Sequence, residues 1–158
     1  MEKEPITPQG IDKIKLELED LKNIKRPKII AAIAEARGHG DLKENAEYHA
    51  AIEQQSLTEA RIRDIESKLS TSQVIDIKNI EPSDKVIFGT TVTVSNTEQH
   101  KSVTYKIVGE DEADASKGKI SFASPLAKQL IGKFEGDLLK VETPGGSVEY
   151  EIEKVNYL

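Results

Sequence analysis

Apolar residues recur at alternating spacings of three and four along the first part of the chain. This pattern is typical of one helix packing along a seam against another, and it comprises Ile11, Ile14, Leu18 and Leu21. Thr7 suits the N-cap and Pro8 the first helical position, where its missing N–H is not needed. Pro27 should kink or restart the helix. The pattern then resumes at Ile29, Ile30, Ile33, Ala34 and Ala36.

A second amphipathic helix is predicted from about Asp41. Its apolar positions are Ala46, Ala50, Ala51, Leu57, Ile62, Ile65 and Leu69. Neither helix carries enough apolar surface for a globular core, and a short reversal joins them. Residues 1–75 are therefore predicted to form an antiparallel α-helical coiled-coil hairpin. At about 1.5 Å per residue, each arm would be on the order of 40 Å long.

The pattern changes near residue 70, and after a short apolar segment β-branched residues dominate. Three segments read as strands: 85–96, 102–109 and 118–124. Ser124 and Pro125 are typical of the N-cap and first position of a short helix, which Gly132 would close. The last segment predicts a hairpin around residues 144–146. The chain is thus expected to be α+β, with residues 76–158 forming an antiparallel sheet and a short helix.

Composition narrows the functional classes. The 158 residues carry a formal net charge of -6, so bulk electrostatic binding to nucleic acid is not expected. The chain has no cysteine, which excludes disulfides and thiolate metal sites. It shows no apolar run of signal-peptide or membrane-span length, so a soluble, cytoplasmic protein is expected.

One basic cluster lies midway along the first arm, at Lys22, Lys25, Arg26 and Lys28. It could contact a phosphate backbone. The commoner role of such a run is a solvated helix face, and this interpretation is preferred.

Three acidic residues follow two glycines at the reversal between the arms: Asp41, Glu44 and Glu47 come after Gly38 and Gly40. In one interpretation, Asp41 is an N-cap and Glu44 completes a capping box, which is the usual role of acids at this spacing. In the other, Asp41 and Glu44 hold part of the ligand set of Mg²⁺, and a partner supplies the rest.

His39 and His49 lie nearby, but their spacing matches no zinc helix motif.

At the reversal, "AIAEARGHGDLKENAEYHAA" resembles the GreA/GreB family of bacterial transcript cleavage factors. The resemblance covers nearly the whole chain, through "RPKIIAAIAEAR", "VIFGTTVTV", "YKIVGEDEAD", "ISFASPLAKQLIGK" and "TPGGSVEYEIEKVNYL". The pattern D-L-K-E-N-A-E-Y is its most specific part. It favours the GreA branch, because the tip of the GreB branch differs around the same acids and its arm is more basic.

The resemblance implies a mechanism. Members dock on RNA polymerase through a C-terminal domain of FKBP-like fold and act as monomers. They insert the coiled coil through the secondary channel to a backtracked complex. There Asp41 and Glu44 would help the polymerase retain a second Mg²⁺ and orient a water, so that the polymerase cleaves the displaced RNA 3′ end. The factor itself would not be an enzyme.

The resemblance also assigns secondary roles. Asn45, Glu47 and Tyr48 would position RNA or water, and Ser124 and Pro125 would lie in the loop that contacts polymerase.

The chain departs from the family pattern at two positions. Ile52 stands where relatives carry a basic residue facing the transcript, which puts RNA contact from the second arm in doubt. Gly38 replaces a bulkier residue, which predicts a more mobile tip.

Two other functions fit the sequence less well. A free-standing peptidyl-prolyl isomerase or chaperone would need an aromatic cage, and the chain has no tryptophan. An inhibitor that only occupies the channel is disfavoured by the intact pair of acids.

Overall fold

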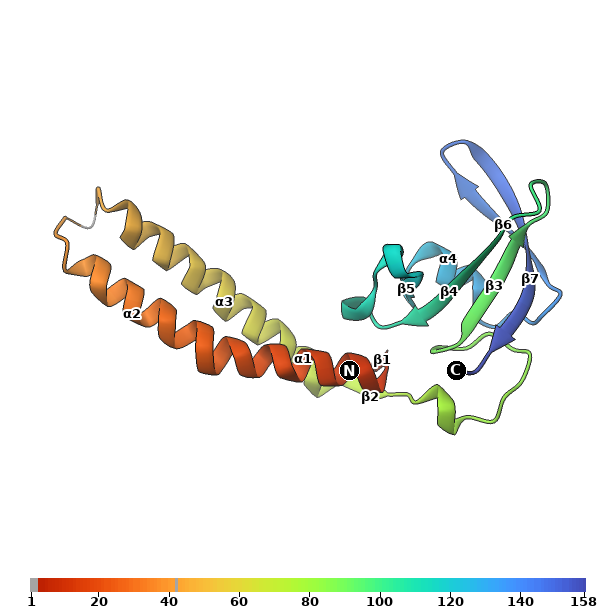
Figure 1. Ribbon diagram of the computed structural model, residues 1–158, viewed down its shortest axis with the longest axis horizontal. Coiled ribbons are helices and arrows are strands. Elements are labelled where there is room, and N and C mark those ends of the chain that lie inside the picture. The colour runs from red at the N-terminus through yellow and green to blue at the C-terminus, as the bar shows by residue number, and fades with distance from the viewer. Residues whose placement is uncertain (1–2, 42) are drawn as a thin grey trace. The chain divides into compact units, whose positions relative to one another are not determined.

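The structure is a computed structural model that describes residues 3–41 and 43–158 (Figure 1). The chain forms two compact units. One comprises Ile11–Ser72, and the other comprises Lys3–Gly10 together with Gln73–Leu158. The first unit is a helical hairpin and the second contains a five-stranded sheet. The expected α+β class is confirmed. In the part of the chain described, no helix is both long and apolar enough to cross a membrane.

The helical hairpin is built from three α-helices. They are α1 (Pro8–Asp20), α2 (Arg26–Arg37) and α3 (Ala46–Thr71), and a π-helical turn at Leu21–Lys25 joins α1 to α2. The start of α1 agrees with the prediction, because the Gly10 N–H donates to the Thr7 hydroxyl over 3.0 Å. Helices α2 and α3 run side by side (Figure 1).

Pro27 restarts the helix as predicted. It lies in the first turn of α2, directly after the π-helical turn. The proline has no N–H to donate, and its ring would crowd the carbonyl of Asn23 in a regular α-helix. The Arg26 N–H instead donates to the Leu21 carbonyl, five residues back. The turn therefore contains one more residue than an α-helical turn would.

Half of the predicted seam is buried. Its buried residues are Ile14, Leu21, Ile29, Ile33, Ala36, Ala51, Ile62 and Ile65. Five predicted seam positions are wrong, because Ile30, Ala34, Ala46, Ala50 and Leu57 are exposed. The two large residues among them, Ile30 and Leu57, are 53% and 66% exposed. Each residue turns a helix by about 100°, so Ile30 is rotated away from the seam that Ile29 occupies. Leu57, six residues after Ala51, is likewise on another face.

The second unit contains a five-stranded sheet with the order β5-β4-β3-β7-β6. Its strands are β3 (Thr91–Asn96), β4 (Ser102–Val108), β5 (Lys119–Ser121), β6 (Leu138–Thr143) and β7 (Gly146–Asn156). The predicted hairpin joins β6 to β7. The antiparallel prediction needs one refinement: β5 pairs with β4 in parallel, so the sheet is mixed. The segment between them is not a hairpin but two 3₁₀ turns, Glu110–Glu112 and Ala115–Lys117.

The short helix α4 (Pro125–Leu130) contributes to the core of this unit. Ser124 caps it by accepting the Ala127 N–H over 3.3 Å, and Pro125 occupies its first turn. Ala127 and Leu130 are completely buried. They belong to a cluster that also includes Val86, Val92, Val94, Ile107 and Ile152.

The N-terminal segment belongs to the second unit, although the sequence analysis placed it with the arms. Strand β1 (Glu4–Ile6) pairs with β2 (Ser72–Val74), and the Ile75 N–H donates to the Ile6 carbonyl over 2.9 Å. The Thr7 hydroxyl donates to the buried carboxylate of Glu112. These long-range contacts hold the segment in place.

Candidate site at the tip of the helical hairpin

The chain reverses direction between α2 and α3. Helix α2 ends at Arg37, and the His39 N–H donates to the Ala36 carbonyl over 3.1 Å. Gly40 has φ 109°, a left-handed conformation that favours glycine. The Asp41 carboxylate then accepts the Lys43 N–H over 2.9 Å, which closes a short turn. This turn presents the first of the two acids.

Helix α3 begins at Ala46 and not at Asp41. Its N-cap is Asn45, whose side-chain oxygen accepts the Tyr48 N–H over 3.0 Å. The prediction that Asp41 and Glu44 form a capping box is therefore wrong. Both Asp41 and Asn45 are good capping residues, and the chain uses the asparagine next to the helix. The two acids remain in the loop before it.

Asp41 and Glu44 are exposed to solvent. Carboxylate oxygens are ligands that Mg²⁺ prefers, so the chemistry of this pair fits that ion. Among the described residues, however, no group of three or more His, Cys, Asp or Glu could hold a metal. A metal ion at the tip would therefore need further ligands from outside these residues.

The two histidines at the tip face different partners. The His39 Nδ1 lies 3.3 Å from a carboxylate oxygen of Glu47. The His49 Nε2 lies 3.1 Å from the Lys43 carbonyl oxygen. These contacts give the imidazoles structural partners within the tip.

The three secondary candidates all connect α3 to the end of α2. The Asn45 side-chain nitrogen donates to the Ala36 carbonyl over 2.6 Å. Glu47 pairs with His39, as described above. The Arg37 guanidinium lies 5.9 Å from the centre of the Tyr48 ring. No sequence pattern indicates these contacts directly, although a short loop between antiparallel helices brings such positions together.

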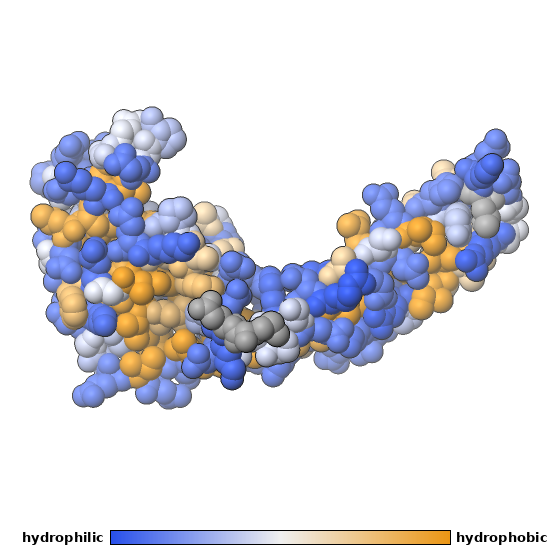
Figure 2. Space-filling model, turned by 180° about the vertical axis from the view of Figure 1, so that it is seen from behind, coloured by the Kyte–Doolittle hydropathy of each residue, from blue (hydrophilic) through white to orange (hydrophobic). Residues whose placement is uncertain are grey.

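Ile52, where the chain departs from the family pattern, packs against other side chains. Ile52 is half-buried against the cluster formed by Ile29, Ile33 and Ala51, and the Tyr48 side chain packs against the same cluster. An apolar residue at this position therefore adds to the packing of this cluster. The greater mobility predicted from Gly38 stays a prediction. Figure 2 shows a mostly hydrophilic surface around the tip.

The basic cluster on the first arm is largely matched by acids. Lys22 lies 3.6 Å from Glu66, and Lys25 lies 3.8 Å from Asp20. Arg26 donates two hydrogen bonds of 2.7 Å to Glu59. These bonds lower the pKa of Glu59. Such pairing supports a solvated, charge-balanced helix face, which was the preferred interpretation.

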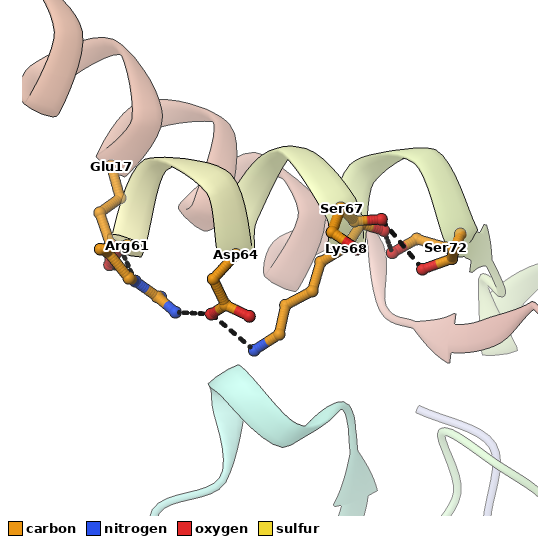
Figure 3. A network of polar contacts seen from close by, with 7 residues as sticks. Glu17, Arg61, Asp64, Ser67, Lys68 and Ser72 are labelled. Atoms are coloured by element: carbon orange, nitrogen blue, oxygen red, sulfur yellow. Dashed lines mark hydrogen bonds and ion pairs between the residues drawn. The ribbon is translucent and has the colours of Figure 1, made fainter. Parts of the chain in front are cut away.

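A second network joins the arms further from the tip. Arg61 of α3 donates to Glu17 of α1 over 2.5 and 3.2 Å, and also to Asp64 over 2.7 Å. Lys68 lies 3.4 Å from the same Asp64 carboxylate (Figure 3). Exposed pairs of this kind contribute little individually, but their geometry favours one register of the two helices.

Comparison with known proteins identifies two family regions. Residues 4–74 match the family described as "Transcription elongation factor, N-terminal", and residues 81–157 match "Transcription elongation factor, GreA/GreB, C-term". Transcription elongation factor GreA of Pseudomonas aeruginosa is 60% identical over 158 residues, covering 100% of both chains. GreA of Thioalkalivibrio sulfidiphilus is 57% identical, also over 100% of both chains.

Among solved structures, GreA factor homolog 1 of Thermus thermophilus is similar with a TM-score of 0.44 and 25% identity. The match covers 98% of this chain and 99% of that one.

Proposed function

This chain belongs to the GreA/GreB family of transcription elongation factors, and from that premise we propose that it stimulates transcript cleavage by RNA polymerase. In this proposal the factor binds bacterial RNA polymerase as a monomer, and its helical hairpin enters the secondary channel. The polymerase then cuts the backtracked RNA near its 3′ end, and elongation resumes. The factor is not itself the nuclease.

The observation that supports this proposal most is the position of the two tip acids. Asp41 and Glu44 are exposed, and Asn45 caps α3 in their place. Neither carboxylate is committed to starting the helix. Their oxygens are therefore available to a site that a partner completes.

Asp41 and Glu44 are the residues that would hold Mg²⁺ jointly with aspartates of the polymerase. A bound Mg²⁺ of this kind supplies positive charge that stabilises the attacking oxygen in phosphoryl chemistry. The chain contributes the two carboxylates, and the helical hairpin carries them on a narrow support. The chain has a formal net charge of -6, which does not attract RNA. The affinity of the factor for the elongation complex would therefore come from its contacts with polymerase.

Docking is assigned to the second unit. The loop at Ser124 and Pro125 precedes α4, and the capping bond of Ser124 fixes its conformation. The same residues can therefore shape the loop and present it to polymerase. The capping role is observed, and the docking role is part of the proposal.

The test is RNA cleavage by a stalled, backtracked elongation complex with Asp41→Asn and Glu44→Gln variants. Both changes preserve side-chain shape and remove charge. Stimulation should fall by at least about 10-fold, as is usual when groups around a metal are altered, and higher Mg²⁺ or Mn²⁺ should partly restore it. Glu53→Gln, an exposed neutralisation on α3, is the matched control and should retain stimulation.

Binding to the elongation complex should persist in all these variants. Full stimulation by the double variant Asp41→Asn/Glu44→Gln would refute the role of the acids. Cleavage of free RNA by the factor without polymerase would contradict the shared site.

A further inference from the structure

Asn45 bridges the ends of two helices with a single side chain. Its oxygen accepts the Tyr48 N–H at the start of α3, over 3.0 Å. Its nitrogen donates to the carbonyl of Ala36 in the last turn of α2, over 2.6 Å. Ala36 is buried. The asparagine therefore closes the base of the loop that carries Asp41 and Glu44.

We propose that Asn45 is a positioning residue for the tip acids, acting through this bridge and not by contacting RNA or water. The inference rests on the proposed function and adds the element that orients its two carboxylates. By tying Ala36 to the start of α3, the Asn45 side chain limits the conformations open to Asp41 and Glu44. Fewer conformations of the loop mean less entropy lost when both carboxylates converge on one ion.

The residue type supports this role. Ser, Thr, Asp and Asn can all cap a helix, but of these only Asn also carries an amide N–H to donate. The structure uses both capacities of the side chain at once. A cap alone would not require the donor.

The other contacts across the tip are weaker. The His39–Glu47 pair is 3.3 Å long and solvent-exposed, with side chains 54% and 73% accessible, so water and salt screen it. The Arg37 guanidinium lies 5.9 Å from the Tyr48 ring centre, near the outer limit of cation–π attraction. The Asn45–Ala36 bond is shorter and partly buried, which leaves it less open to competition from water.

The test uses Asn45→Ser, which keeps a capping oxygen and removes the amide N–H that reaches the Ala36 carbonyl; the serine hydroxyl is shorter by one heavy atom. In the free protein, NMR order parameters of the Lys43 and Glu44 amides should fall, while that of the Tyr48 amide stays high. Asn45→Asp, which is isosteric and also lacks the donor, should give the same loss of order. Asn23→Ser, the same change at an exposed asparagine of the first arm, is the control.

The functional measurement separates positioning from general destabilisation. With Asn45→Ser at saturating factor, stimulated cleavage should fall about 10-fold, and the Mg²⁺ concentration for half-maximal cleavage should rise. The factor concentration for half-maximal stimulation should not change. A purely structural defect would instead shift that factor concentration together with the melting temperature, and would leave the Mg²⁺ midpoint where it is.

Unchanged order parameters in both Asn45 variants would overturn the proposal. Full stimulation with an unchanged Mg²⁺ midpoint would overturn it as well, even if the loop became more mobile. Failure of the proposed function is distinct, because the wild-type factor would then give no stimulation while the order parameters still reported on the bridge.

Discussion

Replacing Gly10 by alanine should destabilise the second unit, against the usual trend. Gly10 is the third residue of α1, and glycine in a helix interior is normally about 1 kcal/mol less favourable than alanine. Here the added Cβ would lie 2.4 Å from both Cδ and Oε2 of Glu112. A Cβ carbon does not approach nonbonded atoms that closely, so the carboxylate would have to move.

The size of the effect follows from what holds that carboxylate. Glu112 is buried and accepts hydrogen bonds from the Thr7 hydroxyl and, over 3.4 Å, from the Gly109 N–H. Forcing an extra carbon into a packed site typically costs about 1–3 kcal/mol. Subtracting the helix gain of about 1 kcal/mol leaves a net destabilisation of about 0–2 kcal/mol.

The assay is equilibrium urea unfolding followed by tyrosine fluorescence. The chain has no tryptophan, and three of its four tyrosines, Tyr105, Tyr150 and Tyr157, lie in the second unit. The signal therefore reports mainly on that unit. The same substitution should also be measured in a Glu112→Ala background, which removes the obstructing group.

In the Glu112→Ala background, Gly10→Ala should stabilise the protein by about 0.5–1 kcal/mol, because only the helix preference remains. The two backgrounds should thus give opposite signs. Stabilisation by Gly10→Ala in the wild-type chain, or the same sign in both backgrounds, would refute the steric reasoning.

Three further predictions concern other contacts. Hydrogen bonds from Ser116 lower the pKa of Asp114. This carboxylate therefore adds stability above its unfolded pKa of about 3.9, and that stability is lost as pH falls through the lower folded pKa. Asp114→Asn should flatten the acid limb of the stability–pH curve, and Ser116→Ala should flatten it partly. Arg26→Ala should cost little stability despite its two bonds to Glu59, because both side chains are about one-third exposed and solvent screens the pair. A double-mutant cycle with Glu59→Ala in urea checks this. A fragment of residues 73–158 should fold, but its free energy of unfolding should be about 1–3 kcal/mol lower than that of the second unit in the full chain. The buried Glu112 carboxylate of the fragment lacks the hydroxyl donor that Thr7 supplies in the full chain. Urea unfolding of the two proteins measures the difference.

Local signals in the sequence predicted local structure well. The helix starts at Pro8 and Pro125, and the restart at Pro27, depend on a proline and its immediate neighbours. The β6–β7 hairpin is also a short-range feature. Each could be predicted because the decisive interactions involve residues close together in the chain.

The remaining features depend on residues that are distant in sequence. Nothing near Thr7 indicates that its hydroxyl meets Glu112, and nothing near β5 indicates that it joins β4 in parallel. At the tip, both Asp41 and Asn45 are good N-caps, so composition could not choose between them. The contact of Asn45 with Ala36 requires the geometry of the closed loop.

The π-helical turn at Leu21–Lys25 has a consequence for how the first arm tolerates changes in length. Leu21 and Ile29, both buried in the seam, are eight residues apart, one more than the seven of a regular heptad. The turn absorbs the additional residue, so the apolar stripes before and after it keep facing the same partner. The arm therefore contains a one-residue insertion that does not rotate the apolar stripe out of the seam.

A deletion of one residue within this turn should therefore be the mildest deletion in the arm. It would convert the turn to a regular α-helical one, shorten the arm by about 1.5 Å and leave both stripes aligned. A deletion elsewhere in the arm would rotate everything between it and the tip by about 100° about the helix axis. The direction in which Asp41 and Glu44 project from the end of the hairpin thus depends, in part, on a single extra residue that lies far from them along the chain.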